Sequence, residues 1–244
     1  MSKLANATSE ISVQQQASPK GEVGAAWRQS KWLAVGELLL VALIFVADAR
    51  HHIYFSKTPY LLILGWISLW IRGIGWRGVG LVRYRSWGIT VALGIGCGLL
   101  MEGFELFVSQ PLLVKLLGKQ PNFENFRALT GNPKLLFLAL VLVWTLAAFG
   151  EEMVYRGYLM NRVADLFRRT RAAWIISLIA VNVGFGLAHS GQGITGMVDE
   201  GLMGILLGLM YLVTGRNLSV PVIAHGVADT IDIVWIFFGH YPGM

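Results

Sequence analysis

Residues 134–156 read KLLFLALVLVWTLAAFGEEMVYR. A helix needs about 17 to 25 predominantly apolar residues to cross roughly 30 Å of hydrocarbon, and the first part of this run meets that requirement. The same run then continues into Glu151, Glu152 and Arg156. Charged groups inside a membrane are expensive, so ionisable residues there are candidates for a functional site. The stretch therefore predicts a transmembrane helix with a site inside it.

The composition is that of a polytopic membrane protein. Of the 244 residues, 55% are hydrophobic and 14% are charged, whereas soluble domains carry about 25% charge. We therefore expect an all-α bundle of about seven to eight transmembrane helices. The net charge of +6 does not indicate nucleic-acid binding, because Lys and Arg lie between the apolar segments and form no continuous stripe. The single cysteine, Cys97, can form no internal disulfide and implies no oxidising compartment.

Seven apolar segments are the candidate spans. They cover residues 32–46, 60–74, 87–108, 134 to beyond 156, 173–189, 202–213 and 220–238, and an amphipathic stretch at 111–117 follows the third. No internal repeat or linker separates them, so residues 31–240 are expected to form one transmembrane domain. Residues 1–30 are polar, lack the basic-then-apolar order of a signal peptide, and are expected to be a disordered tail.

The distribution of positive charge predicts the orientation, since cytoplasmic loops are enriched in Lys and Arg. With seven spans, thirteen of these residues share the side of the N terminus: Lys3, Lys20, Arg28, Lys31, Arg72, Arg77, Arg83, Arg85, Arg162, Arg168, Arg169, Arg171 and Arg216. Six lie on the other side: Arg50, Lys57, Lys115, Lys119, Arg127 and Lys134. We therefore expect the N terminus in the cytoplasm.

Several small and polar residues in the spans have ordinary structural explanations. Two Gly-x-x-x-Gly pairs have the spacing that lets helices approach closely in lipid, and they are Gly94 with Gly98 and Gly204 with Gly208. Isolated polar residues are expected to form interhelical hydrogen bonds, and they are Glu37, Glu102, Glu105 and Asn182. We assign none of these residues a chemical role.

The acidic pair places its two carboxylates differently on the helix. Glu152 and Arg156 are four residues apart with the acid first, which is the favourable order for an ion pair on one face. Glu151 points about 100° away and has no such partner. We expect Glu152 to be the structural counter-ion of Arg156 and Glu151 to be free to act as a general base. The alternative is that both acids serve a buried charge network.

Two further motifs carry histidines. Phe185 and His189 are four residues apart, so the aromatic ring can pack against the imidazole and fix its orientation. His225 and Asp229 share one face of the last span by the same spacing, and Asp232 lies three residues further along. Each motif alone is also compatible with a packed core histidine or with a hydrogen-bonded structural couple.

The three motifs are expected to meet within the hydrocarbon. At 1.5 Å per residue from the ends of their helices on the side of the N terminus, Glu151, His189 and His225 lie about 16, 24 and 14 Å deep. We expect them to share one intramembrane cavity that opens to the cytoplasm. A carboxylate with two imidazoles can activate water and stabilise an oxyanion, which are the two tasks of peptide-bond hydrolysis.

The combination of Glu-Glu-x-x-x-Arg, Phe-x-x-x-His and His-x-x-x-Asp/Asn over residues 133–240 resembles the CPBP intramembrane protease family, also called Abi. That family contains type II CAAX prenyl endopeptidases and bacterial proteins of the lysostaphin-resistance and bacteriocin-immunity kinds. The resemblance implies that Glu151 with His189 activates the attacking water and that His225 helps to hold the oxyanion. The polar tail and the single domain resemble the bacterial members, so we expect a multi-pass protein of a bacterial plasma membrane.

The resemblance leaves the role of Asp229 and the question of a metal open. Eukaryotic members have asparagine where this chain has Asp229; the carboxyl group here is protonated, orients His225, or binds a metal. The family is often labelled metalloprotease, and the candidate ligands of Zn²⁺ are Glu151, His189, His225 and Asp229. The chain lacks His-Glu-x-x-His, and each of these residues has a metal-free role, so we favour a metal-independent glutamate mechanism.

The expected substrate is a membrane-associated peptide or protein. Two other classes remain: a non-catalytic membrane scaffold or bacteriocin-immunity protein that keeps the fold, and, less favoured, a proton-coupled transporter. The transporter class favours inverted helical repeats, and none is visible. A serine intramembrane protease is disfavoured because the chain has no Gly-x-Ser-x-Gly.

Overall fold

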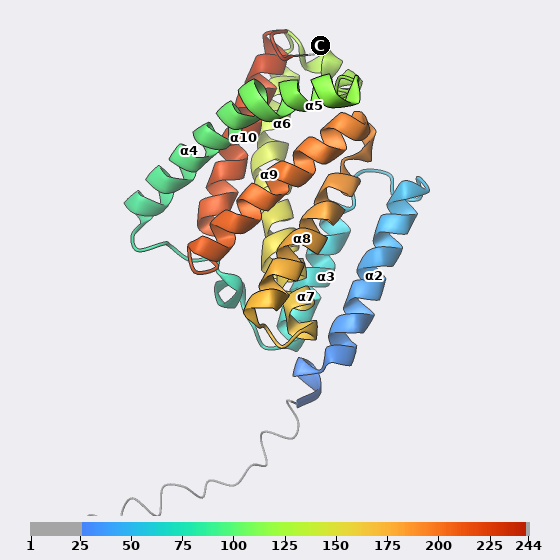
Figure 1. Cartoon of the computed structure of the whole chain (residues 1–244), viewed down its shortest axis with the longest axis vertical. Helices are drawn as coiled ribbons and strands as arrows, with labels where there is room; N and C mark the ends of the chain where they lie inside the picture. Colours follow the sequence, from blue (N-terminus) through green and yellow to red (C-terminus); the bar gives the residue numbers. More distant parts are fainter. Residues whose placement is uncertain (1–25, 243–244) are drawn as a thin grey trace, which may run out of the picture.

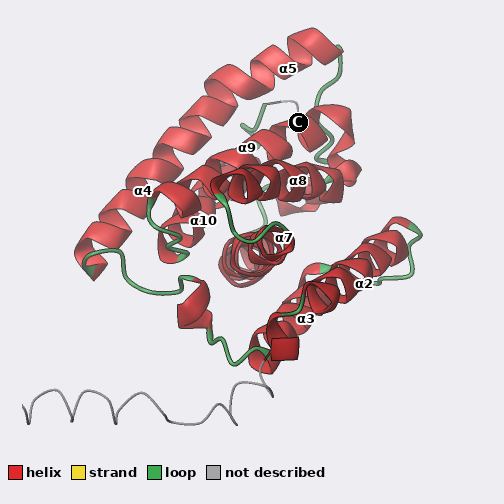
Figure 2. Ribbon diagram, turned by 60° about the horizontal axis from the view of Figure 1, so that its bottom comes forward, coloured by secondary structure: helices red, strands yellow, loops and turns green. Residues whose placement is uncertain are grey.

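The structure of the protein is a computed structural model that describes residues 26–242. Within this range every regular element is helical, which confirms the expected all-α class (Figures 1 and 2). The tail expected over residues 1–30 lies outside the described residues except for its last part, where Ala26–Gln29 form a 3-10 turn.

Six helical segments among the described residues are long and apolar enough to cross a membrane. They are α2 (Lys31–Ala49), Trp87–Leu117, Pro133–Leu166, α8 (Arg171–Ala188), Ser190–Val213 and α10 (Ser219–Phe237). Another apolar helix, α3 (Thr58–Ile71), has 14 residues and is shorter. These helices are consistent with the expected span count.

Two of the long segments contain π-helical turns. The first runs from α4 (Trp87–Phe104) through η3 (Glu105–Ser109) into α5 (Gln110–Leu117). The second runs from α6 (Pro133–Leu142) through η5 (Val143–Glu151) and η6 (Met153–Leu159) into α7 (Met160–Leu166). Such turns inside α-helices often occur at functional sites, and Glu151 ends one of them.

Two boundaries differ from the sequence expectation. The sixth segment begins well before residue 202, because a 3-10 turn (Ser190–Gln192) leads into α9 (Gly193–Val213). Asp199 lies in the first turns of α9, where its side chain is buried and accepts a hydrogen bond from Ser109 Oγ (2.6 Å). The stretch 111–117 continues the third helix, and Pro111 is tolerated because the π turn before it already interrupts the regular hydrogen bonding.

The helix Pro133–Leu166 lies in the middle of the bundle. Residues 152–162 are all buried, and this helix contacts α2, α3, α8 and α10. Outside it, α4 packs against α10 and α8 packs against α9. The α4–α5 rod lies along one edge of the bundle and α2 with α3 along the opposite edge (Figures 1 and 2).

Close helix contacts explain both glycine pairs. A Cβ at Gly98 would lie 2.6 Å from the carbonyl oxygen of Ala224, so α4 and α10 meet only because Gly98 has no side chain. A Cβ at Gly204 would lie 2.9 Å from Asn182 Oδ1 of α8. Both pairs therefore permit helix packing, as their spacing predicted.

The loops gather at two ends of the bundle. The end where α2 begins carries residues 72–86, 167–170 and 214–218, and we call it the tail-side end. The other end carries residues 50–57, 118–132, 189–192 and 238–242, and we call it the far end. Backbone hydrogen bonds join the loops at each end, from Leu218 N to Gly80 O (2.8 Å) and from Asn122 N to Gln192 O (2.9 Å).

Candidate active site

A cavity of about 360 Å³ lies among the helices toward the far end. It brings together the four residues proposed as catalytic, which are Glu151, His189, His225 and Asp229. Its polar lining also includes Glu105, Glu200, Asp232, Gln192 and Tyr241, and its apolar lining includes Phe55, Phe123, Phe126, Leu142 and Ile233. The three sequence motifs thus converge on one cavity.

Glu152 connects the first motif to the third. Its Oε1 accepts a hydrogen bond from Arg156 Nη1 (2.6 Å), which is the ion pair that the spacing predicted. The same oxygen accepts a hydrogen bond from His225 Nδ1 (3.0 Å), which no local pattern predicted. Glu152 and Arg156 are each 0% exposed. The buried pair therefore also holds the imidazole of His225.

Arg156 ties the central helix to α8 and α9. Its Nη2 donates to Asn182 Oδ1 (2.9 Å) and to the carbonyl oxygen of Gly204 (2.7 Å). Gly204 thus both leaves room for the close approach of α8 and supplies an acceptor. Asn182 forms the interhelical hydrogen bond expected of it, and its partner is the guanidinium beneath the site.

His189 is the residue at which α8 ends. Its Nδ1 donates to the carbonyl oxygen of Phe185 (2.9 Å), so in the neutral imidazole Nε2 carries the free lone pair. The ring of Phe185 lies 4.7 Å from the imidazole between centroids, which confirms the predicted packing. Tyr155 packs edge-on against the same phenyl ring at 4.8 Å. Phe185 therefore fixes His189 through both its backbone and its ring.

His225 has a carboxylate at each ring nitrogen. Nδ1 bonds Glu152, and Nε2 lies 3.4 Å from Oδ1 of Asp229. This contact is the couple that the spacing of His225 and Asp229 predicted. The two acids fix the plane of the imidazole, and of the two acids only Asp229, the partner of Nε2, lines the cavity.

Glu151 differs from its neighbour Glu152 in its contacts. It is the last residue of the π turn Val143–Glu151 and is only partly buried. In the part of the chain that the structure describes, no hydrogen bond or ion pair engages its carboxylate, whereas Glu152 is paired twice. Glu151 is therefore the carboxylate in the cavity wall that is available to a substrate or a water molecule.

Glu200 is a further acidic residue of the cavity that was not expected from the sequence. Its Oε1 accepts a hydrogen bond from Gln192 Nε2 (2.9 Å) and lies 4.0 Å from His189 Nε2. The signal was an acidic pair, Asp199 and Glu200, inside an apolar and glycine-rich stretch. Because the sixth span was expected to begin at residue 202, this pair lay outside the expected spans. Glu105 and Asp232, which also line the cavity, had been named without a role.

Tyr241 lies beyond α10, outside the spans, and closes one wall of the cavity. Burial raises the pKa of its phenol well above the ordinary value, and the carboxylates of Asp232 and Glu105 act in the same direction. The hydroxyl accepts a long hydrogen bond from Gln110 Nε2 (3.4 Å). It therefore stays protonated and can donate a hydrogen bond inside the cavity.

The expectation that the cavity opens at the end of the N terminus is wrong. Its lining includes Phe55, Phe123 and Gln192, which belong to three different loops of the far end. His189 had been placed about 24 Å from the tail-side end, which is most of a hydrocarbon layer of roughly 30 Å. The depth of His189 had been counted from the tail-side end alone, although this residue lies nearer to the far end.

The expected zinc ligands do not form a metal cage. Among residues 26–242, no group of three or more His, Cys, Asp and Glu side chains is arranged so that it could hold a metal ion. One reason is that His225 directs Nδ1 to Glu152 and Nε2 to Asp229. The geometry does not fit the four-ligand set, and a chelation experiment tests directly whether Zn²⁺ takes part.

The fold and the cavity define a polytopic membrane protein with an intramembrane site of carboxylates and imidazoles. Residues 133–231 match the family described as type II CAAX prenyl endopeptidase Rce1-like, a protease family. The matched segment contains all three motifs and the residues Glu151, His189, His225 and Asp229. The resemblance predicted from the motifs is confirmed over this segment.

One curated relative is similar to part of the chain. It is "Uncharacterized protein YpbD" of Bacillus subtilis (strain 168), with 30% identity over 117 residues. The aligned stretch is 44% of this chain and 48% of that protein, so the chain spans about half the length of the relative. No solved structure matches the chain.

Proposed function

We propose that the protein is an intramembrane endopeptidase that hydrolyses a peptide bond in a membrane-associated peptide or protein. The observation that carries this proposal is the convergence of Glu151, His189, His225 and Asp229 on one cavity of about 360 Å³. The match of the same segment to a protease family supports it. The nucleophile in this proposal is a water molecule, which Glu151 deprotonates.

Glu151 and His189 activate the water in the proposed first step. The unpaired carboxylate of Glu151 takes a proton as the water oxygen bonds to the scissile carbonyl carbon. His189 accepts a hydrogen bond from the same water at Nε2, because its Nδ1–H is committed to Phe185. When the C–N bond breaks, the proton on Glu151 passes to the leaving amine. Glu151 thus returns to its starting state.

His225 stabilises the oxyanion in the same proposal. In its protonated form it donates Nδ1–H to Glu152 and has Nε2–H for the carbonyl oxygen, which becomes negative in the tetrahedral intermediate. Asp229 lies 3.4 Å from Nε2, and this contact orients the ring so that Nδ1 faces Glu152 and Nε2 faces the carbonyl oxygen of the substrate. Of the three roles open to Asp229, this contact supports the orienting one.

We also infer the side from which the substrate enters. The excess of Lys and Arg on the tail side favours a cytoplasmic N terminus. Since far-end loops line the cavity, the substrate then approaches from the face of the membrane that is turned away from the cytoplasm. The aromatic residues Phe55, Phe123 and Phe126 at this entrance suit an apolar peptide segment.

The proposal is tested with purified protein in detergent and a fluorogenic membrane peptide. Glu151→Gln and His189→Ala are each expected to lower kcat by about 10² to 10⁴-fold, the usual contribution of a general base. Glu124→Gln, which changes an exposed far-end carboxylate outside the cavity lining, serves as the matched control and should cleave normally. Undiminished cleavage by Glu151→Gln would overturn the proposed role of Glu151, and absence of cleavage by the wild type would favour a non-catalytic scaffold or immunity protein.

A further inference from the structure

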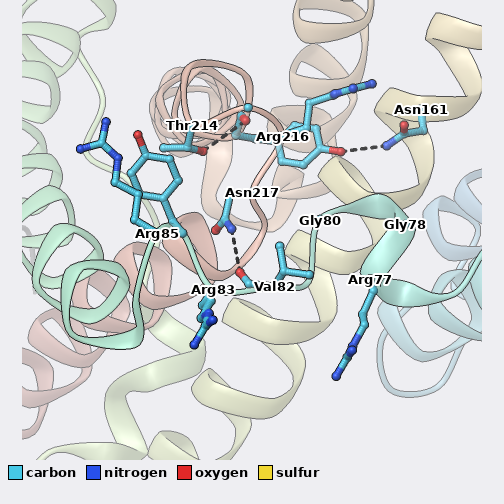
Figure 3. A pocket seen from close by; sticks show the side chains of 13 residues that line it. Arg77, Gly78, Gly80, Val82, Arg83, Arg85, Asn161, Thr214, Arg216 and Asn217 are labelled. Carbon is cyan, nitrogen blue, oxygen red and sulfur yellow. Dashed lines mark hydrogen bonds between the residues drawn. The ribbon is translucent and has the colours of Figure 1, made fainter.

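A second cavity lies at the tail-side end, away from the active site. Its volume is about 340 Å³, and two loops, an asparagine from α7 and a tyrosine from α9 form its walls. Four of its lining residues are arginines, namely Arg77, Arg83, Arg85 and Arg216, and none is acidic. Figure 3 shows this cavity, which we call the arginine pocket.

Two hydrogen bonds hold the two loops of the arginine pocket together. Leu218 N donates to Gly80 O (2.8 Å), and Asn217 Nδ2 donates to Val82 O (2.6 Å). Gly80 has φ +107°, and a Cβ there would overlap the carbonyl oxygen of Arg216. Only glycine fits at this crossing. The pocket is therefore a fixed feature of the fold.

The polar groups on the pocket floor already have partners. Tyr211 donates its hydroxyl to Val79 O (3.1 Å), and Asn161 donates Nδ2 to that hydroxyl oxygen (3.0 Å). The arginines differ: among residues 26–242, none of the four forms a hydrogen bond or an ion pair through its guanidinium. The pocket thus offers four guanidinium groups whose hydrogen-bond donors are unused within the described part of the chain.

Two of these arginines occupy backbone conformations that L residues rarely adopt. Arg85 has φ +56° and Arg216 has φ +65°. Such positions occur where the surrounding structure fixes them, often at binding sites. Their guanidinium groups rest on aromatic rings, Arg85 5.4 Å from Tyr84 and Arg216 5.3 Å from Trp174. In Figure 3 the four guanidinium groups stand around the pocket without converging, so a ligand has to draw them together.

The pocket lies at the depth of a lipid headgroup. Trp87, the first residue of α4, is 58% exposed, and Trp70, near the end of α3, is 77% exposed. Exposed tryptophans at the ends of spans mark the interface between hydrocarbon and water. One guanidinium group can bind two phosphate oxygens at once, and basic pockets between helices bind anionic headgroups.

We propose that the arginine pocket binds a phosphate group, from an anionic phospholipid of the leaflet or from free phosphate. The proposal does not depend on the protease activity, because its residues lie outside the active-site cavity. It requires only that the tail-side end faces a phase that contains this anion.

The test measures lipid binding to the full chain in detergent by native mass spectrometry. Arg77, Arg83, Arg85 and Arg216 are changed together to Gln; the control changes Arg28, Lys31, Arg168 and Arg171, which lie outside the pocket at the same end, with the same loss of charge. The protein is titrated with phosphatidylglycerol or phosphatidylcholine. The pocket variant should lose about tenfold or more in affinity for phosphatidylglycerol, and the control less than about threefold.

Inorganic phosphate distinguishes the two sources. If it displaces phosphatidylglycerol at equal concentration, the pocket takes a free phosphate; if it does not, the lipid headgroup is the ligand. An equal loss of affinity in both variants would mean attraction by net charge alone and would overturn the proposal, as would equal affinity for the two lipids. Should the fourfold pocket variant fail to fold, Arg83→Gln with Arg85→Gln is compared with Arg168→Gln and Arg171→Gln in the same assay.

Discussion

His225 Nδ1 donates a hydrogen bond to Glu152 Oε1 over 3.0 Å, although 73 residues separate the two in sequence. The same oxygen receives Arg156 at 2.6 Å. One buried carboxylate therefore serves as the counter-ion of an arginine and as the anchor of a histidine in the cavity wall. Glu152 thus has both a structural and a chemical role. We therefore expect substitutions of Glu152 to act differently from substitutions of Glu151.

Glu152→Gln should unfold more easily than the wild type. Removing one partner of a fully buried ion pair leaves the other charge uncompensated, at a cost of about 3 to 5 kcal/mol. Thermal unfolding in detergent measures this effect, and Glu124→Gln, at an exposed ion pair with Arg127, should change stability by less than about 1 kcal/mol. An unfolding midpoint equal to that of the wild type would show that the Glu152–Arg156 pair does not stabilise the fold.

Asp229→Asn should keep much of the peptidase activity, whereas Asp229→Leu should not. An amide can still orient His225 and can donate a hydrogen bond to an oxyanion, and a leucine can do neither. We expect Asn to retain activity within about tenfold and Leu to lose about 10²-fold or more. Steady-state kinetics at one pH measure both variants, and equal activities would mean that Asp229 does not act through His225.

Chelation should leave the activity unchanged, since water activation by Glu151 and His189 needs no metal. The measurement is peptide cleavage before and after dialysis against a strong chelator, followed by addition of Zn²⁺. Loss on chelation with recovery on Zn²⁺ would establish a metal site and replace the glutamate mechanism, whatever the arrangement of the side chains without the ion.

The far end should be accessible from outside an intact cell. In a background of Cys97→Ser, Asn125→Cys places a thiol on an exposed far-end residue and Arg171→Cys places one on the tail side. A membrane-impermeant maleimide should label only Asn125→Cys in intact cells and both variants after lysis. The reverse pattern would place the cavity entrance in the cytoplasm and contradict the orientation taken from the charge bias.

Gly98→Ala should destabilise the bundle, and Gly96→Ala should not. A Cβ at Gly98 would lie 2.6 Å from the carbonyl oxygen of Ala224, while one at Gly96 would meet nothing within 4 Å. Overpacking of this kind costs about 1 to 3 kcal/mol, whereas alanine in open space favours the helix. Thermal unfolding of the two variants gives the comparison, and similar midpoints would contradict the tight α4–α10 contact.

The features that the sequence predicted depend on local geometry. Apolar runs predict spans because a helix must cover a hydrocarbon layer of fixed thickness. The spacing of four residues predicts the contacts of Glu152 with Arg156, Phe185 with His189, and His225 with Asp229, because such pairs share a helix face. These three contacts are present.

The features that it did not predict depend on how helices from distant parts of the chain pack. The bond from His225 to Glu152 needs α10 beside the central helix, and Glu200 reaches His189 only because α9 begins next to the end of α8. The side on which the cavity opens is different, because the expected fifth span, residues 173–189, already ended at His189; the depth of this residue had been counted from the tail side alone.

In the proposed mechanism, the carboxylate of Glu151 makes a water molecule nucleophilic inside the cavity. The most direct measurement is the kcat of purified wild type and Glu151→Gln on one membrane peptide, with both proteins shown to unfold at the same temperature. We expect a fall in kcat of about 10² to 10⁴-fold with an unchanged unfolding midpoint. Equal kcat values for two equally folded proteins would contradict it.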